Sequence, residues 1–288
     1  MRRLFWVGPA LAAVVLVALV VLVTMRRSED TLEQARRSGV IRVGYAPEAP
    51  FAFRAPNGTV TGESPEIARE VLRRMGIARI EWVQTEWGAL IPELKARQFD
   101  IIAAGMFITC ERAREVAFTR PTFRLGEALL VAQGNPRQLH SYADIKVRAD
   151  VHLAVVRGAI EYQIAQAQGI PDERILAVPD AQTGLVAVRS GRVDALALTS
   201  MSVDRLAASD PTHVERAMPF DAPLMNGQPV AGYGALAVRP EDDALLQALN
   251  AELAQIVGSD EHLRLVARFG FSRDDLPPQD APPLSNCQ

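Results

Sequence analysis

The order of strands and helices along the chain constrains its fold more than any other feature. Strand-like runs at residues 40–45, 78–85 and 99–104 alternate with helical patterns at residues 64–75 and 87–97. Strands that reach their neighbours through helices require a parallel sheet with helices on its faces. The first half of the chain therefore predicts an α/β unit.

The helix predicted at residues 64–75 has recognisable signals at both ends. Ser64 is expected as its N-cap, Pro65 as its first helical residue and Gly76 as the residue that ends it. Its apolar residues fall on one face, as in an amphipathic helix that covers a sheet.

A second copy of the same unit begins after residues 134–136. Its strands are predicted at 151–156, 175–178, 193–198 and 232–238, and its helices at 159–168, 181–190 and 242–257. Two copies imply two lobes with a cleft between them, and ligands of open α/β sheets bind at the carboxyl ends of the strands, which would face that cleft.

The chain is expected to pass between the two lobes twice, at residues 129–133 and 235–239. We expect residues 29–132 and 235–272 to form lobe I and residues 133–234 to form lobe II. The Pro-rich tail at residues 273–288 is expected to be irregular.

Residues 4–24 contain no charged side chain and are flanked by arginines on both sides. A helix needs about 20 apolar residues to cross a bilayer, whereas the core of a signal peptide is shorter. We interpret residues 1–28 as an uncleaved signal anchor, with a cleaved signal peptide as the alternative. Either interpretation places the folded part outside the cytoplasmic membrane, in the periplasm or at the cell surface.

The composition excludes several classes of function. A net charge of −3 with scattered arginines argues against a nucleic-acid-binding protein. The four histidines lack the spacing of metal ligands, so we expect no metal and no cofactor. Cys110 and Cys287 lie far apart in the sequence, and we expect no structural disulfide.

Five stretches carry a resemblance to a known family: IRVGY at 41–45, GESPEIA at 62–68, FDIIAAG at 99–105, TCER at 109–112 and GRVDA at 191–195. In this order they resemble the extracellular solute-binding proteins of ABC importers, in the class that handles polar amino acids. The resemblance implies an α/β, two-lobe, periplasmic-binding-protein-like fold (type II) with a hinge-closing cleft. It also implies a monomer without enzymatic activity that delivers a small solute to permease subunits.

Within that class the chain is most similar to the ectoine- and hydroxyectoine-binding proteins, through residues 48–51, 104–109, 140–142 and 232–234. The resemblance implies an aromatic box of Phe51, Trp87 and Phe107 around the ring of a compatible solute. Arg112 would then take the carboxylate of the solute and Glu48 its amidinium. The chain departs from these relatives at Trp87, where tyrosine is expected, and at Cys110, where proline is usual.

The chemistry of these residue types agrees with such a site. The guanidinium of Arg112 matches a carboxylate with two parallel hydrogen bonds, unless it pairs with Glu111 or Glu115 on an exposed helix face. Each aromatic face against a cation contributes roughly 0.5–2 kcal/mol. Phe51 and Trp87 could instead be core residues, and Glu48 a solvated loop carboxylate.

Thr199 argues against an ordinary amino acid as ligand. The resemblance implies an aspartate at this position in amino-acid binders, five residues after Asp194, to pair with the α-ammonium. An ammonium buried without its carboxylate would be costly, so we expect a delocalised or quaternary cation. In the second lobe, residues 158–161 would offer backbone N–H groups at a helix N-terminus, with Glu161 as a first-turn helix residue rather than a ligand contact.

Other functions stay open at this point. One is the binding of a polar, cationic or modified amino acid by the same kind of protein. Another is an enzyme similar to cyclohexadienyl dehydratases, for which only Glu48 or Glu161 could supply the general acid. A receptor-type sensor domain is a further alternative.

Overall fold

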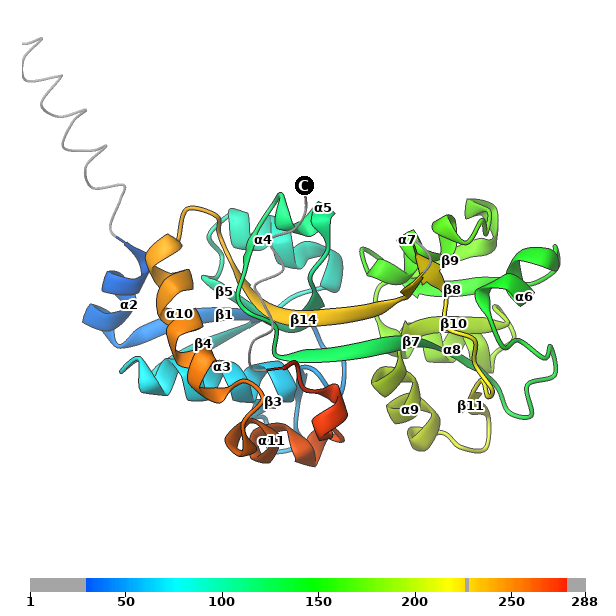
Figure 1. Ribbon diagram of the computed structural model, residues 1–288. Coiled ribbons are helices and arrows are strands. Elements are labelled where there is room, and N and C mark those ends of the chain that lie inside the picture. Colours follow the sequence, from blue (N-terminus) through cyan, green and yellow to red (C-terminus); the bar gives the residue numbers. More distant parts are fainter. Residues whose placement is uncertain (1–29, 226–227, 279–288) are drawn as a thin grey trace, which may run out of the picture.

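The computed structural model describes residues 30–225 and 228–278. They form two α/β lobes that lie side by side and are bridged by two long strands (Figure 1). The membrane-spanning segment predicted at residues 4–24 lies outside the described residues. Among the residues that are described, no helix is both long and apolar enough to cross a bilayer.

Lobe I is built around three parallel strands, with β1 in the middle, β4 on one side and β5 on the other. The strands are β1 (Val40–Tyr45), β4 (Arg79–Gln84) and β5 (Ile101–Phe107). The helices of this lobe are α2 (Thr31–Ser38), α3 (Glu63–Arg74), α4 (Leu90–Lys95), α10 (Asp243–Ile256) and α11 (Asp260–Val266). Short pieces complete it: β2 (Phe53–Arg54), β3 (Val60–Thr61), α5 (Cys110–Ala113) and β6 (Ala117–Phe118).

Lobe II repeats the arrangement around a second set of parallel strands, in the order β10, β8, β9. The strands are β8 (Leu153–Val156), β9 (Ile175–Val178), β10 (Ala195–Thr199) and the short β11 (Val214–Arg216). The helices are α6 (Tyr142–Val147), α7 (Ile160–Ala167), α8 (Ala181–Arg189) and α9 (Ser200–Ser209). A two-stranded ribbon of β12 (Leu224–Met225) and β13 (Gln228–Pro229) also belongs to this part of the chain.

Two antiparallel strands, β7 (Phe123–Ala132) and β14 (Ala231–Val238), carry the chain between the lobes (Figure 1). β14 pairs with β5 in lobe I, and β7 pairs with β10 in lobe II. The lobe boundary predicted after residue 132 falls at the end of β7, and the one after residue 234 falls inside β14. These boundaries stay a prediction, because the two strands pair with each other as well as with the strands of one lobe each.

The parallel pairing expected from the strand and helix order is confirmed in both lobes. The strand predicted at residues 40–45 has those bounds. The prediction that Ser64 is the N-cap is wrong. Helix α3 begins at Glu63, and its N-cap is Gly62, whose φ of 127° suits glycine. The Ser64 hydroxyl instead accepts a hydrogen bond from the Gly105 backbone N–H of β5 at 2.9 Å, which ties the helix to the sheet.

The helix predicted at residues 87–97 is shorter than expected. A single 3₁₀ turn covers Trp87–Ala89, and the α-helix runs only over Leu90–Lys95. Pro92 fixes this start, because a proline is tolerated only in the first turn, where its missing N–H has no partner to lose.

Cys110 is bonded in a disulfide, so the expectation that the chain has no structural bridge is wrong. The other cysteine of the sequence, Cys287, lies outside the described residues.

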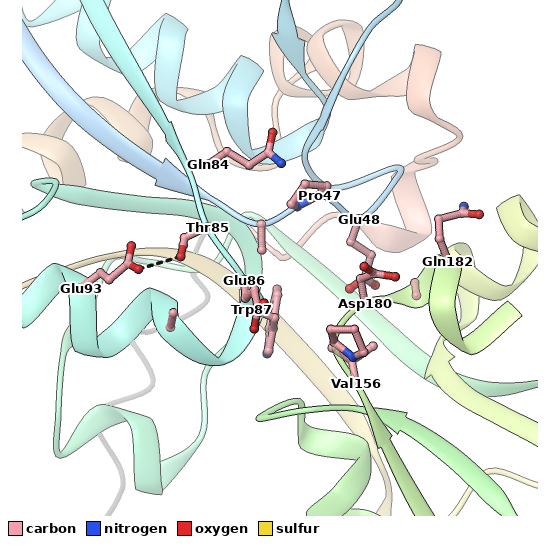
Figure 2. A pocket seen from close by; sticks show the side chains of 14 residues that line it. Pro47, Glu48, Gln84, Thr85, Glu86, Trp87, Glu93, Val156, Asp180 and Gln182 are labelled. Carbon is pink, nitrogen blue, oxygen red and sulfur yellow. Dashed lines mark hydrogen bonds between the residues drawn. The ribbon is translucent and has the colours of Figure 1, made fainter. Parts of the chain in front are cut away.

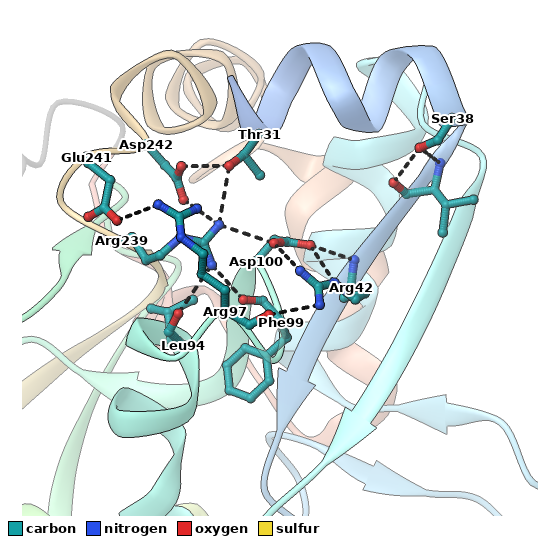
Figure 3. Close-up of polar contacts among 11 residues, drawn as sticks. Thr31, Ser38, Arg42, Leu94, Arg97, Phe99, Asp100, Arg239, Glu241 and Asp242 are labelled. Atoms are coloured by element: carbon teal, nitrogen blue, oxygen red, sulfur yellow. Dashed lines mark hydrogen bonds and ion pairs between the residues drawn. The ribbon is translucent and has the colours of Figure 1, made fainter. Parts of the chain in front are cut away.

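A buried ion cluster holds the N-terminal helix and the end of β14 to lobe I (Figure 3). Arg239 is 1% exposed, and its Nη2 lies 3.1 Å from Asp100 Oδ1 and 2.7 Å from Asp242 Oδ2. Its Nη1 donates to the carbonyl oxygen of Phe99 at 2.7 Å, and the Thr31 hydroxyl donates to Asp242 at 2.7 Å. One guanidinium thus joins α2, α10 and the start of β5.

We predict that Arg239→Met destabilises the protein by about 3–5 kcal/mol, because it leaves the buried Asp242 carboxylate without its cationic partner, while Asp100 keeps its ion pair with Arg42. Urea unfolding at pH 7 measures the change. Arg97→Met is the control, since Arg97 pairs with Glu241 at the surface, where both side chains are more than half exposed. Its expected cost is below about 1 kcal/mol. Equal costs for the two variants would contradict the role given to Arg239.

Candidate ligand-binding site

The structure brings all six residues predicted for the site into one pocket between the lobes. The pocket is small in this closed arrangement, with about 20 Å³ of free space, enough for roughly one water molecule. Its walls come from both lobes and comprise Glu48, Phe51, Trp87, Ala104, Gly105, Phe107, Arg112, Ala159, Ile160, Glu161, Leu198 and Thr199.

Glycines make room for two of the aromatic rings. A Cβ on Gly105 would lie 2.6 Å from the ring of Phe51, and one on Gly232 would lie 1.9 Å from the ring of Phe107. Both rings pack on Phe123, with centroids 5.0 Å and 5.8 Å from it. Phe51 and Phe107 are therefore at once part of the lobe I core and part of the pocket wall.

Trp87 closes the pocket from the strand-to-helix junction after β4. Its indole Nε1–H donates to the Gly158 carbonyl oxygen of lobe II at 3.2 Å. The guanidinium of Arg112 lies 5.7 Å from the centroid of its ring, within the range of a cation–π contact. Figure 2 shows the Trp87 side chain at the edge of the cleft, near Glu48.

Arg112 is buried, and it forms no ion pair with Glu111 or Glu115, so the surface-pair alternative is wrong. Its Nη1 donates to the Phe107 carbonyl oxygen at 2.8 Å and its Nη2 to that of Gly158 at 3.0 Å. Burial lowers the pKa of Arg112, and the nearby carboxyl of Glu161 raises it. The guanidinium is held in place by carbonyl groups of both lobes, and no carboxylate of the described residues neutralises it by direct contact.

Glu48 is partly buried at the rim of lobe I and not a free loop carboxylate. It accepts a hydrogen bond from the Ser202 hydroxyl of α9 at 2.6 Å, which crosses from one lobe to the other. Burial raises the pKa of Glu48, and the Ser202 hydrogen bond lowers it. Ser202 was missed in the sequence because nothing near residue 202 distinguishes it from an ordinary helix serine.

Lobe II contributes Thr199 at the end of β10 and Glu161 in the first turn of α7. Glu161 is a first-turn residue as expected, and it also lines the pocket and is only 3% exposed. Burial, together with the charge of Glu48, raises the pKa of Glu161 to about 7.

Glu127 on β7 was not predicted for the site. It is buried, and burial together with Glu161 raises its pKa far above the usual value. A charged residue inside the apolar run at 125–131 was the signal that could have indicated it, since a carboxylate is rarely buried without a reason.

A larger cavity of about 610 Å³ opens beside the pocket and shares Glu48 and Trp87 with it (Figure 2). Both lobes contribute polar side chains to its wall: Gln84, Thr85, Glu86 and Glu93 come from lobe I, and Asp180 and Gln182 from lobe II. The Thr85 hydroxyl donates to Glu93 at 2.9 Å, as Figure 2 shows.

Comparison with known proteins agrees with this architecture. Residues 41–272 match the family model of bacterial extracellular solute-binding proteins, family 3. The chain belongs to this family. A probable amino-acid ABC transporter periplasmic-binding protein from Sinorhizobium fredii is 35% identical over 248 residues, which cover 85% of this chain and 82% of that protein.

Other members of family 3 differ in what their names say they bind. The histidine-binding periplasmic protein of Salmonella typhimurium is 25% identical over 80% of this chain and 86% of its own length. The crystal structure of EhuB in complex with hydroxyectoine is 34% identical with a TM-score of 0.78, covering 85% of this chain and 94% of that one. An ancestral amino acid-binding protein, described as a precursor of cyclohexadienyl dehydratase, is 28% identical with a TM-score of 0.72 over 83% of this chain and 99% of that one.

As a member of family 3, the chain is the substrate-binding protein of an ABC transporter of the amino-acid type, and its place is outside the cytoplasm. Such a protein holds a small solute and works with permease components. The predicted two-lobe, α/β periplasmic-binding-protein fold is confirmed.

Gly158 of lobe II and Gly88 of lobe I lie close together where the lobes close. A Cβ on Gly158 would lie 3.2 Å from the Gly88 Cα of the opposite lobe. We predict that Gly158→Ala shifts the protein toward an open form, because such crowding costs about 1–3 kcal/mol. Small-angle X-ray scattering should show a larger radius of gyration than for the unchanged protein.

Gly191→Ala is the matched control for that variant. Gly191 has a φ of 70°, similar to the 78° of Gly158, but nothing lies within 4 Å of its added Cβ. The Gly191→Ala variant should have similar backbone strain, but its radius of gyration should equal that of the unchanged protein. The same radius of gyration for both variants would contradict the proposed contact.

Proposed function

We propose that this protein captures ectoine or hydroxyectoine and delivers it to an ABC permease. The observation that carries the proposal is the meeting of three aromatic rings, one guanidinium and one carboxylate in a single pocket: Phe51, Trp87, Phe107, Arg112 and Glu48. A ring-shaped zwitterion offers the complementary groups, namely a delocalised cation for the rings and Glu48, and a carboxylate for Arg112.

The similarity to EhuB supports the proposal, because that structure holds hydroxyectoine and shares 34% of its sequence with this chain. Thr199 supports it as well. Its side chain is uncharged at the position where the family resemblance places the aspartate that meets an α-ammonium.

Binding of a polar or cationic amino acid is the second candidate. The relatives that are named as histidine- or arginine-binding proteins favour it, as do the two additional buried carboxyl groups of Glu127 and Glu161. In that case a carboxyl group other than residue 199 would take the ammonium.

We further propose that the protein is a monomer without enzymatic activity and that residues 4–24 attach it to the membrane. The similarity to a precursor of cyclohexadienyl dehydratase keeps an enzyme as the remote alternative, with Glu48 or Glu161 as general acid.

A thermal-shift panel tests the substrate class. We predict that ectoine or hydroxyectoine at about 100 times its dissociation constant stabilises the protein by about 2.7 kcal/mol, which raises Tm by about 5–10 °C. Glycine betaine, proline, glutamine, arginine and histidine are the comparison ligands. A shift with one of the amino acids and none with the ectoines would replace the first candidate by the second.

Arg112→Ala tests the carboxylate contact. Two charge-assisted hydrogen bonds are lost, so we predict that the affinity for ectoine in calorimetry falls by roughly 100-fold or more. Arg114→Ala is the matched control, since Arg114 follows on the same short helix but is exposed. Near-unchanged affinity of Arg112→Ala would exclude Arg112 as the carboxylate partner.

A further inference from the structure

Three polar side chains lie on the lobe II side of the pocket: Glu161, Thr199 and Glu127. Glu161 and Thr199 line the pocket itself. Glu127 stands directly opposite Thr199 in the antiparallel pairing of β7 with β10. Directly opposed residues point to the same face of a sheet, so the Glu127 carboxyl group lies beside the Thr199 hydroxyl group.

Several oxygen atoms of this group have no hydrogen-bond partner within the described residues. They are both carboxyl oxygens of Glu127, Oε2 of Glu161 and the hydroxyl Oγ1 of Thr199. The three residues are 3%, 3% and 7% exposed, so solvent does not satisfy these atoms. Buried polar groups are nearly always paired, and an unpaired one is costly. What these oxygens lack is a donor.

The charges around the pocket also indicate a ligand that brings a cationic donor. Three carboxyl groups, those of Glu48, Glu127 and Glu161, influence one another electrostatically there. Arg112 is the one cation among the described residues that line the pocket. If Arg112 takes the carboxylate of a ligand, the acidic groups are left without positive charge.

Burial and the neighbouring Glu161 raise the pKa of Glu127, and burial together with the charge of Glu48 raises the pKa of Glu161 to about 7. The buried hydroxyl of Tyr142 lies near the pair and also has no partner among the described residues, and the pair helps to raise its pKa. A cation bound beside these two carboxyl groups would stabilise their charged form, which only accepts hydrogen bonds.

We propose that Glu161, Glu127 and Thr199 form a second acidic subsite in lobe II, which receives N–H groups of a cationic ligand. The subsite rests on the proposed function in that the ligand is a small zwitterion or cation held between the lobes. It selects cations that carry N–H donors, such as an amidinium, a guanidinium or a primary ammonium. It disfavours quaternary ammonium groups, because N-methyl groups donate no strong hydrogen bond and would leave the carboxyl oxygens unpaired.

A first experiment probes the subsite without relying on the natural substrate. The full chain is labelled with ¹³C at the glutamate side-chain carboxyl groups and titrated with acetamidinium and, separately, with tetramethylammonium at constant ionic strength. We expect acetamidinium to shift the carboxyl resonances of Glu161 and Glu127 to saturation, and tetramethylammonium to leave them in place. No shift with acetamidinium, or equal shifts with both cations, would overturn the subsite.

A second experiment uses ectoine and variants in calorimetry. Glu161→Gln and Glu127→Gln should each weaken ectoine binding by about tenfold or more, since each replaces a carboxyl group that a bound cation would ionise by a neutral amide. Thr199→Val tests the same subsite by removing the hydroxyl at similar size, should either glutamine variant fail to fold. Glu173→Gln, an exposed glutamate in the same lobe, should leave the affinity within about twofold.

The two experiments distinguish a failure of the proposed subsite from a failure of the proposed substrate. Acetamidinium binding without ectoine binding would support the subsite and contradict the proposed substrate. Ectoine binding that the three subsite variants leave unchanged would support the substrate and contradict the subsite.

Discussion

The antiparallel pairing of β7 with β14 is the constraint on which the rest of the structure depends. These two strands are the bridge between the lobes, and each is also a member of one lobe's sheet. The register places Phe123 opposite Gly234, where a side chain would collide with the Phe123 ring. The strands that connect the lobes therefore also carry the ring on which Phe51 and Phe107 pack, and the carboxyl group of Glu127.

Several of the contacts that close the lobes are made by residues of the pocket. Trp87 and Arg112 of lobe I donate to the same Gly158 carbonyl oxygen, and Ser202 of lobe II donates to Glu48. The side chains proposed to hold the ligand are thus also the ones that join the lobes. A ligand that binds them would exchange contacts between the lobes for contacts with itself, which is how a differential affinity shifts an open–closed equilibrium.

Local signals predicted the elements but not their ends. The strand at residues 40–45 could be predicted because β-branched residues and a following Pro-rich loop are local properties. The start of α3 could not, because Ser64 is a good N-cap in isolation, and its hydroxyl is drawn into a contact with Gly105 instead. Family resemblance located Arg112 and the aromatic residues, whereas Glu127 and Ser202 reached the site through pairing and packing that no short motif encodes.

The sequence by itself determined the two α/β units and their parallel strands, since periodicity acts over neighbouring residues. The family resemblance of its motifs located the six residues that the structure brings to one pocket. Only the tertiary structure decided which charges face one another across the cleft. Glu127 and Thr199 are 72 positions apart in the chain, yet one strand pairing sets them side by side. Burial then changes the carboxyl groups, because removal of water raises the pKa of an acid, so that a bound cation is needed to stabilise its charged form.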